Sequence, residues 1–435
     1  MFIRYLLLGL TCAPIWAAPA ASVTYYKDVL PVLQKNCQSC HRPGEAAPMS
    51  FQTYDTTRPW AKSIKQAVQT RKMPPWFADP HTGQFTNDRS LAKADIDLLT
   101  RWADTGAPAG DPKQAPAPVQ FADGWQMGKP DRVYEMPVDF QVPASGTLEY
   151  TYFVIPTGFT EDRWVTASEA RPGNRAIVHH MIAFVRAPGS KWMADAKPGI
   201  PFIPKDERGS GGEGRDGMAD EWLAGYAPGT PPMQLKPGQA RLVPAGSDIV
   251  FQVHYTANGK AQSDRSRLGL KFATGPVAER VTMAAASTSK FAIPPGDANY
   301  QVKAVTTLAA PARLVNLQPH MHLRGKAFSY KLIYPDGRTR ELLNVPRYDF
   351  NWQLVYEPAG DLTLPAGTQM ECIATYDNSA NNPFNPDPKK EVHWGDQSWE
   401  EMMIGFFDIA IDPKMDRREL YPRRKSAKKP ASSGD

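Results

Sequence analysis

Hydrophobic residues recur every three to four positions in three stretches of the first 110 residues. The stretches run from Tyr25 to Leu33, from Trp60 to Val68 and from Ala94 to Trp102. This spacing predicts amphipathic helices, and Thr105-Gly106 supplies an end signal for the last of them. We therefore expect a small all-α domain over residues 21–110.

From about residue 136 the pattern changes to short hydrophobic runs, each bounded by Gly, Pro, Asn or Asp. Such runs predict β-strands, and their close succession is typical of β-sandwich domains. The runs are Leu148–Ile155, Ala176–Val185, Asp248–Tyr255, Val302–Leu308, Phe328–Tyr334 and Gln369–Tyr376. The region is too long for one small sandwich, so we expect two all-β sandwiches in tandem, over residues 136–280 and 281–415. The 42 prolines among 435 residues also favour β-structure with many turns.

The first 20 residues have the composition of an export signal. A hydrophobic run from Tyr5 to Trp16 is followed by Ala18-Pro19-Ala20, which predicts a signal peptide cleaved near Ala20. No later run approaches the ~18 uninterrupted apolar residues of a membrane-spanning helix. We expect a periplasmic or secreted protein that is not integral to a membrane. Lipid attachment at Cys12 stays open, although Thr11 stands where a small residue usually precedes such a cysteine.

The net charge of +5 comes mostly from the C-terminal end of the chain. Residues 416–435 carry seven Lys or Arg against three Asp or Glu, a net +4, which leaves +1 for the remainder. A nearly neutral body predicts no nucleic-acid-binding face. We expect residues 111–135 to be a proline-rich linker, the Gly-rich loop 206–220 to be mobile, and the basic tail 416–435 to be disordered.

Cys37-Gln-Ser-Cys40-His41 matches C-x-x-C-H, the pattern of covalent c-type haem attachment. The two thiols would bond the porphyrin vinyl groups, and His41 would ligate the iron from one side. A dithiol redox pair would need a βαβ setting, which the helical surroundings do not provide. We therefore expect one covalent haem c in this domain.

The sixth ligand of the iron is expected to be a methionine, because a thioether favours the ferrous state and raises the potential. Met73, in Arg-Lys-Met-Pro-Pro-Trp, follows His41 by 32 residues and is the favoured candidate. Met49 follows His41 by only eight residues, a short reach to the opposite face of the haem. His81 is a third candidate.

Five of the eight histidines lie in three places within the β region. They are the adjacent His179 and His180, the single His254, and His320 and His322 of a His-Met-His sequence. Residues i and i+2 of a strand face the same way, so His320 and His322 can bind one metal ion. Adjacent residues face opposite sides, so binding of one ion by His179 and His180 requires a bulge or a local twist.

Copper is the metal that this pattern favours. Carboxylates near these strands are few, which disfavours hard cations, whereas imidazole and imidazole–thioether sites suit copper. The thioether would come from Met402 or Met403, in Trp-Glu-Glu-Met-Met-Ile-Gly-Phe-Phe.

Four motifs in this order resemble the copper type II, ascorbate-dependent monooxygenases, the family of the peptidylglycine α-hydroxylating and dopamine β-hydroxylating enzymes. The motifs are Val-His-His-Met, Phe-Gln-Val-His-Tyr, Pro-His-Met-His-Leu-Arg-Gly-Lys and Glu-Glu-Met-Met, and the resemblance covers residues 136–415. Residues 23–110 resemble instead a small bacterial c-type cytochrome domain, through C-x-x-C-H and Met-Pro-Pro-Trp.

The first resemblance implies two mononuclear copper sites on two jelly-roll domains that face each other across a cleft. The electron-transfer copper would be held by His179, His180 and His254. The oxygen-binding copper would be held by His320, His322 and Met402. Met402 is preferred over Met403 because it follows the acidic pair as the family's ligand does.

The chain also departs from this family. Amidating members clamp a peptide carboxylate with an arginine two residues before the His-x-His pair and with an Asn and a Tyr just past the methionine. These positions are Gln318, Ile404 and Phe406 here, so peptide amidation is not expected. The family's numerous disulfides are also missing, since Cys372 is the one cysteine of the β region.

These features predict a monooxygenase that hydroxylates a C–H bond of an unknown organic substrate with O2. The haem would admit electrons from an external donor, either a redox protein or a small reductant. Two other functions stay open on the same scaffold: a non-hydroxylating haem and copper electron-transfer protein, and an oxidase or reductase of a small molecule. An open methionine-ligated copper separates the first from simple electron transfer, which needs no oxygen-binding site.

Overall fold

The computed structural model describes residues 22–45, 47–121, 124–204, 221–227 and 229–422. Within them the chain forms two compact units. One comprises the described residues of Met1–Pro43, Met49–Pro74 and Leu91–Val119, and the other comprises those of Gly44–Pro48, Pro75–Ser90 and Gln120–Asp435. The expected signal peptide with Cys12, the loop 206–220 and residues 423–435 of the basic tail lie outside the described residues.

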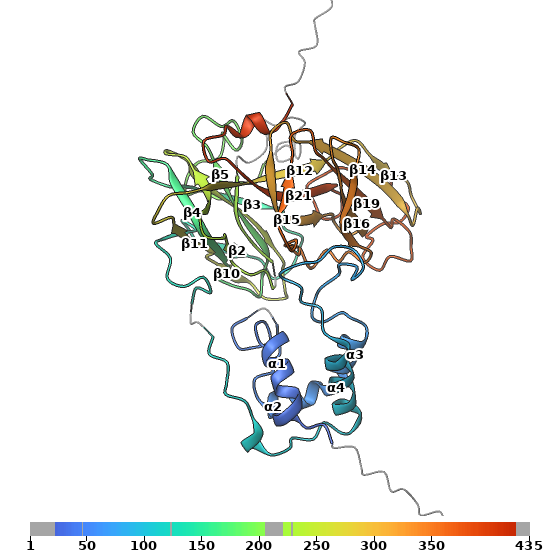
Figure 1. The fold of residues 1–435 in the computed structure, drawn as a ribbon. Coiled ribbons are helices and arrows are strands. Elements are labelled where there is room, and N and C mark those ends of the chain that lie inside the picture. The colour runs from blue at the N-terminus through green and yellow to red at the C-terminus, as the bar shows by residue number, and fades with distance from the viewer. Residues whose placement is uncertain (1–21, 46, 122–123, 205–220, 228, 423–435) are drawn as a thin grey trace, which may run out of the picture. The chain divides into compact units, whose positions relative to one another are not determined.

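The first unit is helical, as the spacing of its hydrophobic residues predicted (Figure 1). Its elements are η1 (Tyr25–Val29), α1 (Leu30–Asn36), α2 (Tyr54–Thr57), η2 (Arg58–Trp60), α3 (Ala61–Gln69), α4 (Lys93–Asp104) and η3 (Pro112–Gln114). Their hydrophobic faces meet around Tyr25 and Trp102, which are fully buried. The Trp102 indole N–H donates to the Pro108 carbonyl at 3.1 Å, so the one polar atom of this buried ring is satisfied. Among the described residues, no helix has both the length and the hydrophobicity to cross a bilayer.

The second unit is built from β-sheets, which confirms the expectation of β-sandwiches. A nine-stranded sheet extends through the whole unit. In order its strands are β1 (Arg132–Glu135), β11 (Arg267–Phe272), β4 (Arg163–Arg171), β8 (Gln239–Val243), β12 (Glu279–Ser287), β21 (Ile404–Ile411), β15 (Ala312–His320) and β18 (Leu362–Leu364), with β7 (Met233–Gln234) beside β4.

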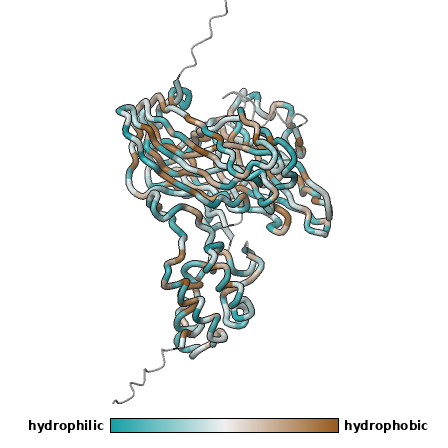
Figure 2. Tube along the Cα trace, turned by 90° about the vertical axis from the view of Figure 1, so that its right-hand side faces the viewer, coloured by the Kyte–Doolittle hydropathy of each residue, from teal (hydrophilic) through white to brown (hydrophobic). Residues whose placement is uncertain are grey.

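Two four-stranded sheets pack against the two halves of this long sheet. One contains β3 (Thr151–Pro156), β9 (Asp248–Tyr255), β5 (Val178–Arg186) and β6 (Glu221–Tyr226), and the other contains β14 (Tyr300–Thr307), β19 (Gln369–Tyr376), β16 (Gly325–Ile333) and β17 (Thr339–Val345). Short pairs join β2 (Phe140–Val142) to β10 (Gln262–Asp264) and β13 (Ala292–Ile293) to β20 (Val392–His393). Hydrophobic residues recur along these strands and fill a separate core in each sandwich (Figure 2).

The two sandwiches are joined by hydrogen bonds between their sheets. β8 of the first runs parallel to β12 of the second, with Gln239 opposite Glu279 and Ala240 opposite Arg280. The expected boundary between residues 280 and 281 therefore falls inside β12, and β1 begins before residue 136. The long sheet thus joins the two β-sandwiches, which the sequence suggested were separate tandem domains, into one unit.

Two segments belong to the β unit although the sequence placed them elsewhere. Residues 75–90, expected in the helical domain, carry Trp76, whose ring lies 4.8 Å from that of Tyr356 in the core of the second sandwich. Residues 416–422 were expected to be disordered, but η5 (Arg417–Leu420) ends at Leu420, which is fully buried in the same core. In both cases burial of a hydrophobic side chain outweighs the polar composition of the segment.

Candidate metal centres

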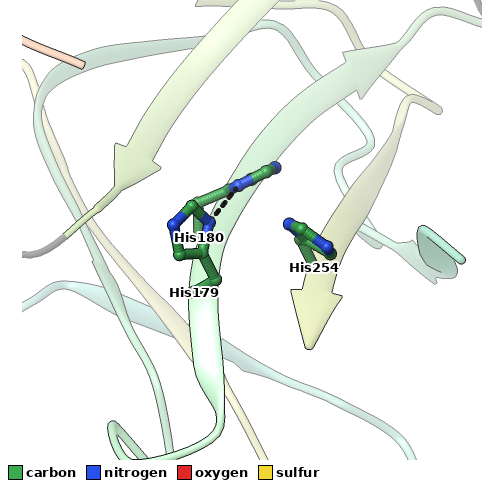
Figure 3. A group of neighbouring side chains, drawn as sticks. All are labelled: His179, His180 and His254. Carbon is green, nitrogen blue, oxygen red and sulfur yellow. Dashed lines mark hydrogen bonds between the residues drawn. The ribbon is translucent and has the colours of Figure 1, made fainter. Parts of the chain in front are cut away.

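The first histidine group lies on the neighbouring strands β5 and β9. His180 is directly opposite His254, and the strand register shifts between Val178 and His180. This shift is the irregularity that the adjacent histidines were expected to need, because it lets His179 turn to the same side as His180. The three residues offer nitrogen atoms that all lie within 4.8 Å of one another. Figure 3 shows the three rings gathered around a common space.

Burial keeps these imidazoles neutral, the form that binds metals. Burial, reinforced by His179, lowers the pKa of His254 to about 4. Burial lowers the pKa of His180 well below its usual value, and the neighbouring His254 and His179 lower it further. Nδ1 of His254 is buried without a hydrogen-bond partner among the described residues, and Nδ1 of His179 lies 3.2 Å from Nδ1 of His180. A metal ion would satisfy these lone pairs, so the residues fit one.

The second group comprises His320, the last residue of β15, and His322, two residues beyond it. Their ring centroids are 5.3 Å apart. Nδ1 of His320 lies 2.8 Å from Oε1 of Gln353, and Nδ1 of His322 lies 3.2 Å from the Glu400 carbonyl. Because both acceptors can only receive a hydrogen, each ring must carry its proton on Nδ1 and present the lone pair of Nε2. Nε2 of His322 is buried with no protein partner in the described chain.

Glu401 fixes the backbone that carries these two histidines. Its carboxylate accepts the backbone N–H of His322 at 2.8 Å and that of Arg324 at 2.6 Å. Burial raises the pKa of Glu401 to about 8, while these N–H groups act in the opposite direction. Tyr348 binds the same turn, because its hydroxyl lies 3.1 Å from the N–H and 2.9 Å from the carbonyl oxygen of Met321.

Met402 and Met403 face different surroundings. Met402 lines the same cavity as His320 and His322, and its carbonyl accepts a hydrogen bond from the Tyr376 hydroxyl at 2.7 Å. Met403 is fully buried in the core of the second sandwich. Of the two candidates for the thioether, Met402 therefore lines the cavity of the two histidines and Met403 does not. Two imidazoles and a thioether suit copper better than zinc or a hard cation.

One cavity of about 2000 Å³ connects the two groups. It is lined by His180 of the first group and by His320, His322 and Met402 of the second. Aromatic rings form much of its wall, and the ring of Phe406 lies 6.0 Å from that of His320 and 5.5 Å from that of Trp222. The positions that differ from the amidating enzymes, Gln318, Ile404 and Phe406, all line this cavity.

The segment 37–41, where the sequence predicts haem attachment, lies directly after α1. The backbone N–H groups of Cys40 and His41 both donate to the Cys37 carbonyl, at 3.1 and 2.9 Å, in a tight turn. Cys37 and Cys40 are free thiols, and the imidazole of His41 stacks on Phe51 with its Nδ1 unpaired within the described structure. Burial raises the pKa of Cys37 to about 12. Two adjacent thiols and an unsatisfied imidazole fit covalent haem.

The candidates for the second haem ligand are placed differently. Met49 packs against the hydrophobic core that also contacts Cys37. Met73 is half-buried in the segment after α3, where its N–H donates to the Ala67 carbonyl at 3.2 Å. His81 is exposed and belongs to the β unit.

Several residues of the second centre gave no clear signal in the sequence. Gln353, Tyr348 and Phe350 lie in a loop far along the chain from every histidine, so no spacing rule connects them. The sequence around Glu401 does carry a signal, because a carboxylate beside the hydrophobic Met-Met-Ile-Gly-Phe-Phe run must find partners when it is buried. His322 was expected on a strand, but β15 ends at His320 because the chain turns at 323–324.

No known protein-family model matches the chain. No curated protein matches it either. Among solved structures, the infectious bursal disease virus VP2 subviral particle is similar at 11% identity over 72% of this chain and 78% of the other, with a TM-score of 0.19. An allantoicase is similar at 10% identity over 55% of this chain and 81% of the other, with a TM-score of 0.16. Likenesses of this size support no conclusion about function.

Proposed function

We propose that this protein is an exported, haem- and copper-dependent monooxygenase that hydroxylates a C–H bond of an organic substrate with O2. The observation that carries the proposal is the placement of Met402. Met402 lines the cavity that His320 and His322 also line, whereas Met403 is buried in the core. A group of two imidazoles and a thioether leaves coordination positions open for a small molecule, which an electron-transfer site does not need.

Copper held by these residues would supply electrons one at a time and activate dioxygen. The net reaction takes the substrate C–H bond, O2, two electrons and two protons to the alcohol and water. We assign the three-imidazole group His179, His180 and His254 to electron delivery and the group with Met402 to the reacting centre. The covalent haem at Cys37, Cys40 and His41 would be the entry point for electrons from an external donor.

The protein's own residues orient this chemistry. Gln353 and the Glu400 carbonyl hold the Nδ1 protons of His320 and His322, so that both Nε2 lone pairs are available for the metal. Glu401 holds the backbone N–H groups of His322 and Arg324, and Tyr348 holds the backbone of Met321 between the two histidines. The rings of Phe406 and Trp222 provide a hydrophobic wall that excludes water and positions a substrate C–H bond.

The cavity lacks the side chains with which amidating enzymes clamp a peptide carboxylate, although other basic residues such as Arg89 and Lys290 line it elsewhere. Gln318 and Phe406 stand where amidating enzymes have an arginine and a tyrosine, and the buried Arg241 is already engaged. Its guanidinium pairs with Glu221 at 2.8 Å and with Asp408 at 2.5 Å. We therefore propose a substrate other than a peptide with a free C-terminus.

Counting the cofactors of the exported protein tests the proposal. We expect one covalent haem and two coppers per chain, and uptake of one ¹⁸O atom from ¹⁸O2 into the product of any accepted substrate. Haem with a full complement of zinc, or haem with no copper, would contradict the proposal. Two coppers with no oxygen consumption under any reducing condition would favour the electron-transfer alternative.

A further inference from the structure

A single aromatic ring lies between the two histidine groups. Phe350 stacks on His179, with ring centroids 5.6 Å apart and planes at 23°, and meets His322 edge-on at 5.9 Å. Phe350 is 9% exposed. It follows β17 in the second sandwich, whereas His179 belongs to the first. The two groups are therefore separated by a packed ring on this side rather than by open solvent.

The residues around Phe350 also contact the histidine groups. Gln353 receives the Nδ1 proton of His320, and Tyr348 hydrogen-bonds both backbone groups of Met321. On the other side, the Asn351 side chain makes a polar contact with the His179 ring. The segment 348–353 thus contacts His320, His322 and the residue between them, and reaches across to His179.

His179 has a particular need for such support. It lies at the register shift of β5, so the regular pairing of β5 with β9 does not fix its direction as it fixes that of His180, which is opposite His254. The contacts that orient its ring outside its own group come from Phe350 and Asn351. Both belong to the other sandwich.

We propose that Phe350 and Asn351 are positioning residues that hold His179 in the orientation of a metal ligand. Metal binding by His179, His180 and His254 then depends on a loop of the second sandwich, and the two centres are coupled through one packed segment. This inference rests on the proposed function for the presence of metal at the histidine groups. Removal of a group that orients a metal-bound histidine typically lowers metal affinity by about 10- to 100-fold.

The test measures Cu(II) binding to the first group by the full-length, haem-containing protein. All proteins carry His320→Ala, so that the three-imidazole group is the one titrated against a competing chelator, with its EPR signal as the signature. We expect Phe350→Leu and Asn351→Ala each to weaken Cu(II) binding by about tenfold or more and to alter the EPR signal. Asn351 is exposed, so its variant tests the inference even if Phe350→Leu folds poorly.

Matched controls separate positioning from general packing. Phe328→Leu removes the same atoms from a fully buried ring that packs on Tyr330 at 5.1 Å, and Asn381→Ala truncates an exposed asparagine of the same sandwich. Both controls should retain the parent's Cu(II) affinity, even where Phe328→Leu lowers the unfolding midpoint. Parent-like affinity in Phe350→Leu and Asn351→Ala would overturn the inference and leave the proposed function intact. Absence of Cu(II) binding in the parent itself would overturn both.

Discussion

The carboxylate of Glu401 accepts the backbone N–H of His322 at 2.8 Å, and the next residue along the chain, Met402, faces the cavity that His322 lines. One short segment therefore holds the backbone just after β15 through Glu401 and carries the proposed third ligand, Met402. Its backbone is itself held by the Tyr376 hydroxyl. The second centre is consequently built from two segments whose relative position is fixed by buried hydrogen bonds.

Met402→Leu should remove the second copper and leave the rest of the protein intact. The substitution conserves volume, so the fold, the haem and the copper at His179, His180 and His254 should persist, while oxygen-dependent turnover falls by orders of magnitude. Reduced-state X-ray absorption should lose its copper–sulfur contribution. Met403→Leu is the matched control and should cost under ~1.5 kcal/mol with the sulfur contribution retained. The reverse result would show that the ligand is Met403.

Glu401→Gln should disturb the second centre selectively. A glutamine can accept one of the two backbone N–H groups with its oxygen but turns its NH2 group toward the other, leaving a buried donor unpaired. Above the pKa of about 8, where Glu401 is ionised, we expect a loss of about 1–3 kcal/mol in the free energy of unfolding and a weakened copper at His320 and His322. Metal analysis and chemical denaturation measure the two effects. Glu400→Gln, at the neighbouring position, should keep the second copper because His322 contacts the Glu400 backbone carbonyl, not its carboxylate.

Cys37→Ser with Cys40→Ser should abolish covalent haem while the β unit still folds. The two thiols lie in a turn of the helical unit, which has a hydrophobic core of its own. Haem staining after denaturing electrophoresis checks the attachment, and haem retained by the double variant would refute it.

Met73→Ala should lower the haem potential and give a high-spin or water-ligated spectrum. An unchanged spectrum there, with a changed one for Met49→Ala, would reassign the ligand to Met49.

Arg241→Met should destabilise the β unit as a whole. Arg241 on β8 pairs with Glu221 on β6 and with Asp408 on β21, so it connects the first sandwich to the second. Both carboxylates would be left buried without their counter-charge, which typically costs about 3–5 kcal/mol. Chemical denaturation should show a lower midpoint for a single transition. Arg338→Met, which removes an exposed arginine paired with Asp336, should leave the midpoint unchanged.

Glu371→Gln should lower stability at neutral pH but not in acid. Lys303 and Lys331 flank Glu371 on the neighbouring strands and lower the pKa of its carboxyl below the usual 4.5. A carboxyl with a lowered folded-state pKa stabilises the protein above its unfolded pKa and loses this contribution as the pH falls through the folded value. We expect a difference of about 1 kcal/mol at pH 7 that shrinks and is then lost as the pH falls through the folded-state pKa of Glu371. Urea denaturation at neutral pH and along an acid series measures it, and a difference that stays constant into acid would exclude the ionic origin.

Local features of the fold could be predicted because they depend on residues close in the sequence. The strands expected at Asp248–Tyr255 and Gln369–Tyr376 are β9 and β19 with the same bounds. The irregularity at His179 followed from two adjacent histidines that must face one ion. Both cases use only the two-residue period of a strand.

Features that depend on distant segments could not be predicted. No pattern within β8 or β12 indicates that they pair in parallel across the two sandwiches. The hydrophobic pattern of a strand predicts the strand itself but not the strand with which it pairs. In the sequence, nothing distinguishes Phe350 from an ordinary loop residue. Its contact with His179 exists only in the folded chain. The same limit applies to Glu401, whose backbone partners lie more than seventy residues earlier in the chain.

The path of residues 75–90 has a consequence for how the protein can be divided. The chain leaves the helical unit after Pro74, contributes Trp76 to the second sandwich and returns at Leu91. Truncation of everything before the proline-rich segment would therefore strip the β unit of a buried tryptophan and expose the ring of Tyr356. The helical unit therefore cannot be removed by cutting the chain at one point, and a fusion or domain exchange that keeps both units intact must carry residues 75–90 with the β-sandwiches.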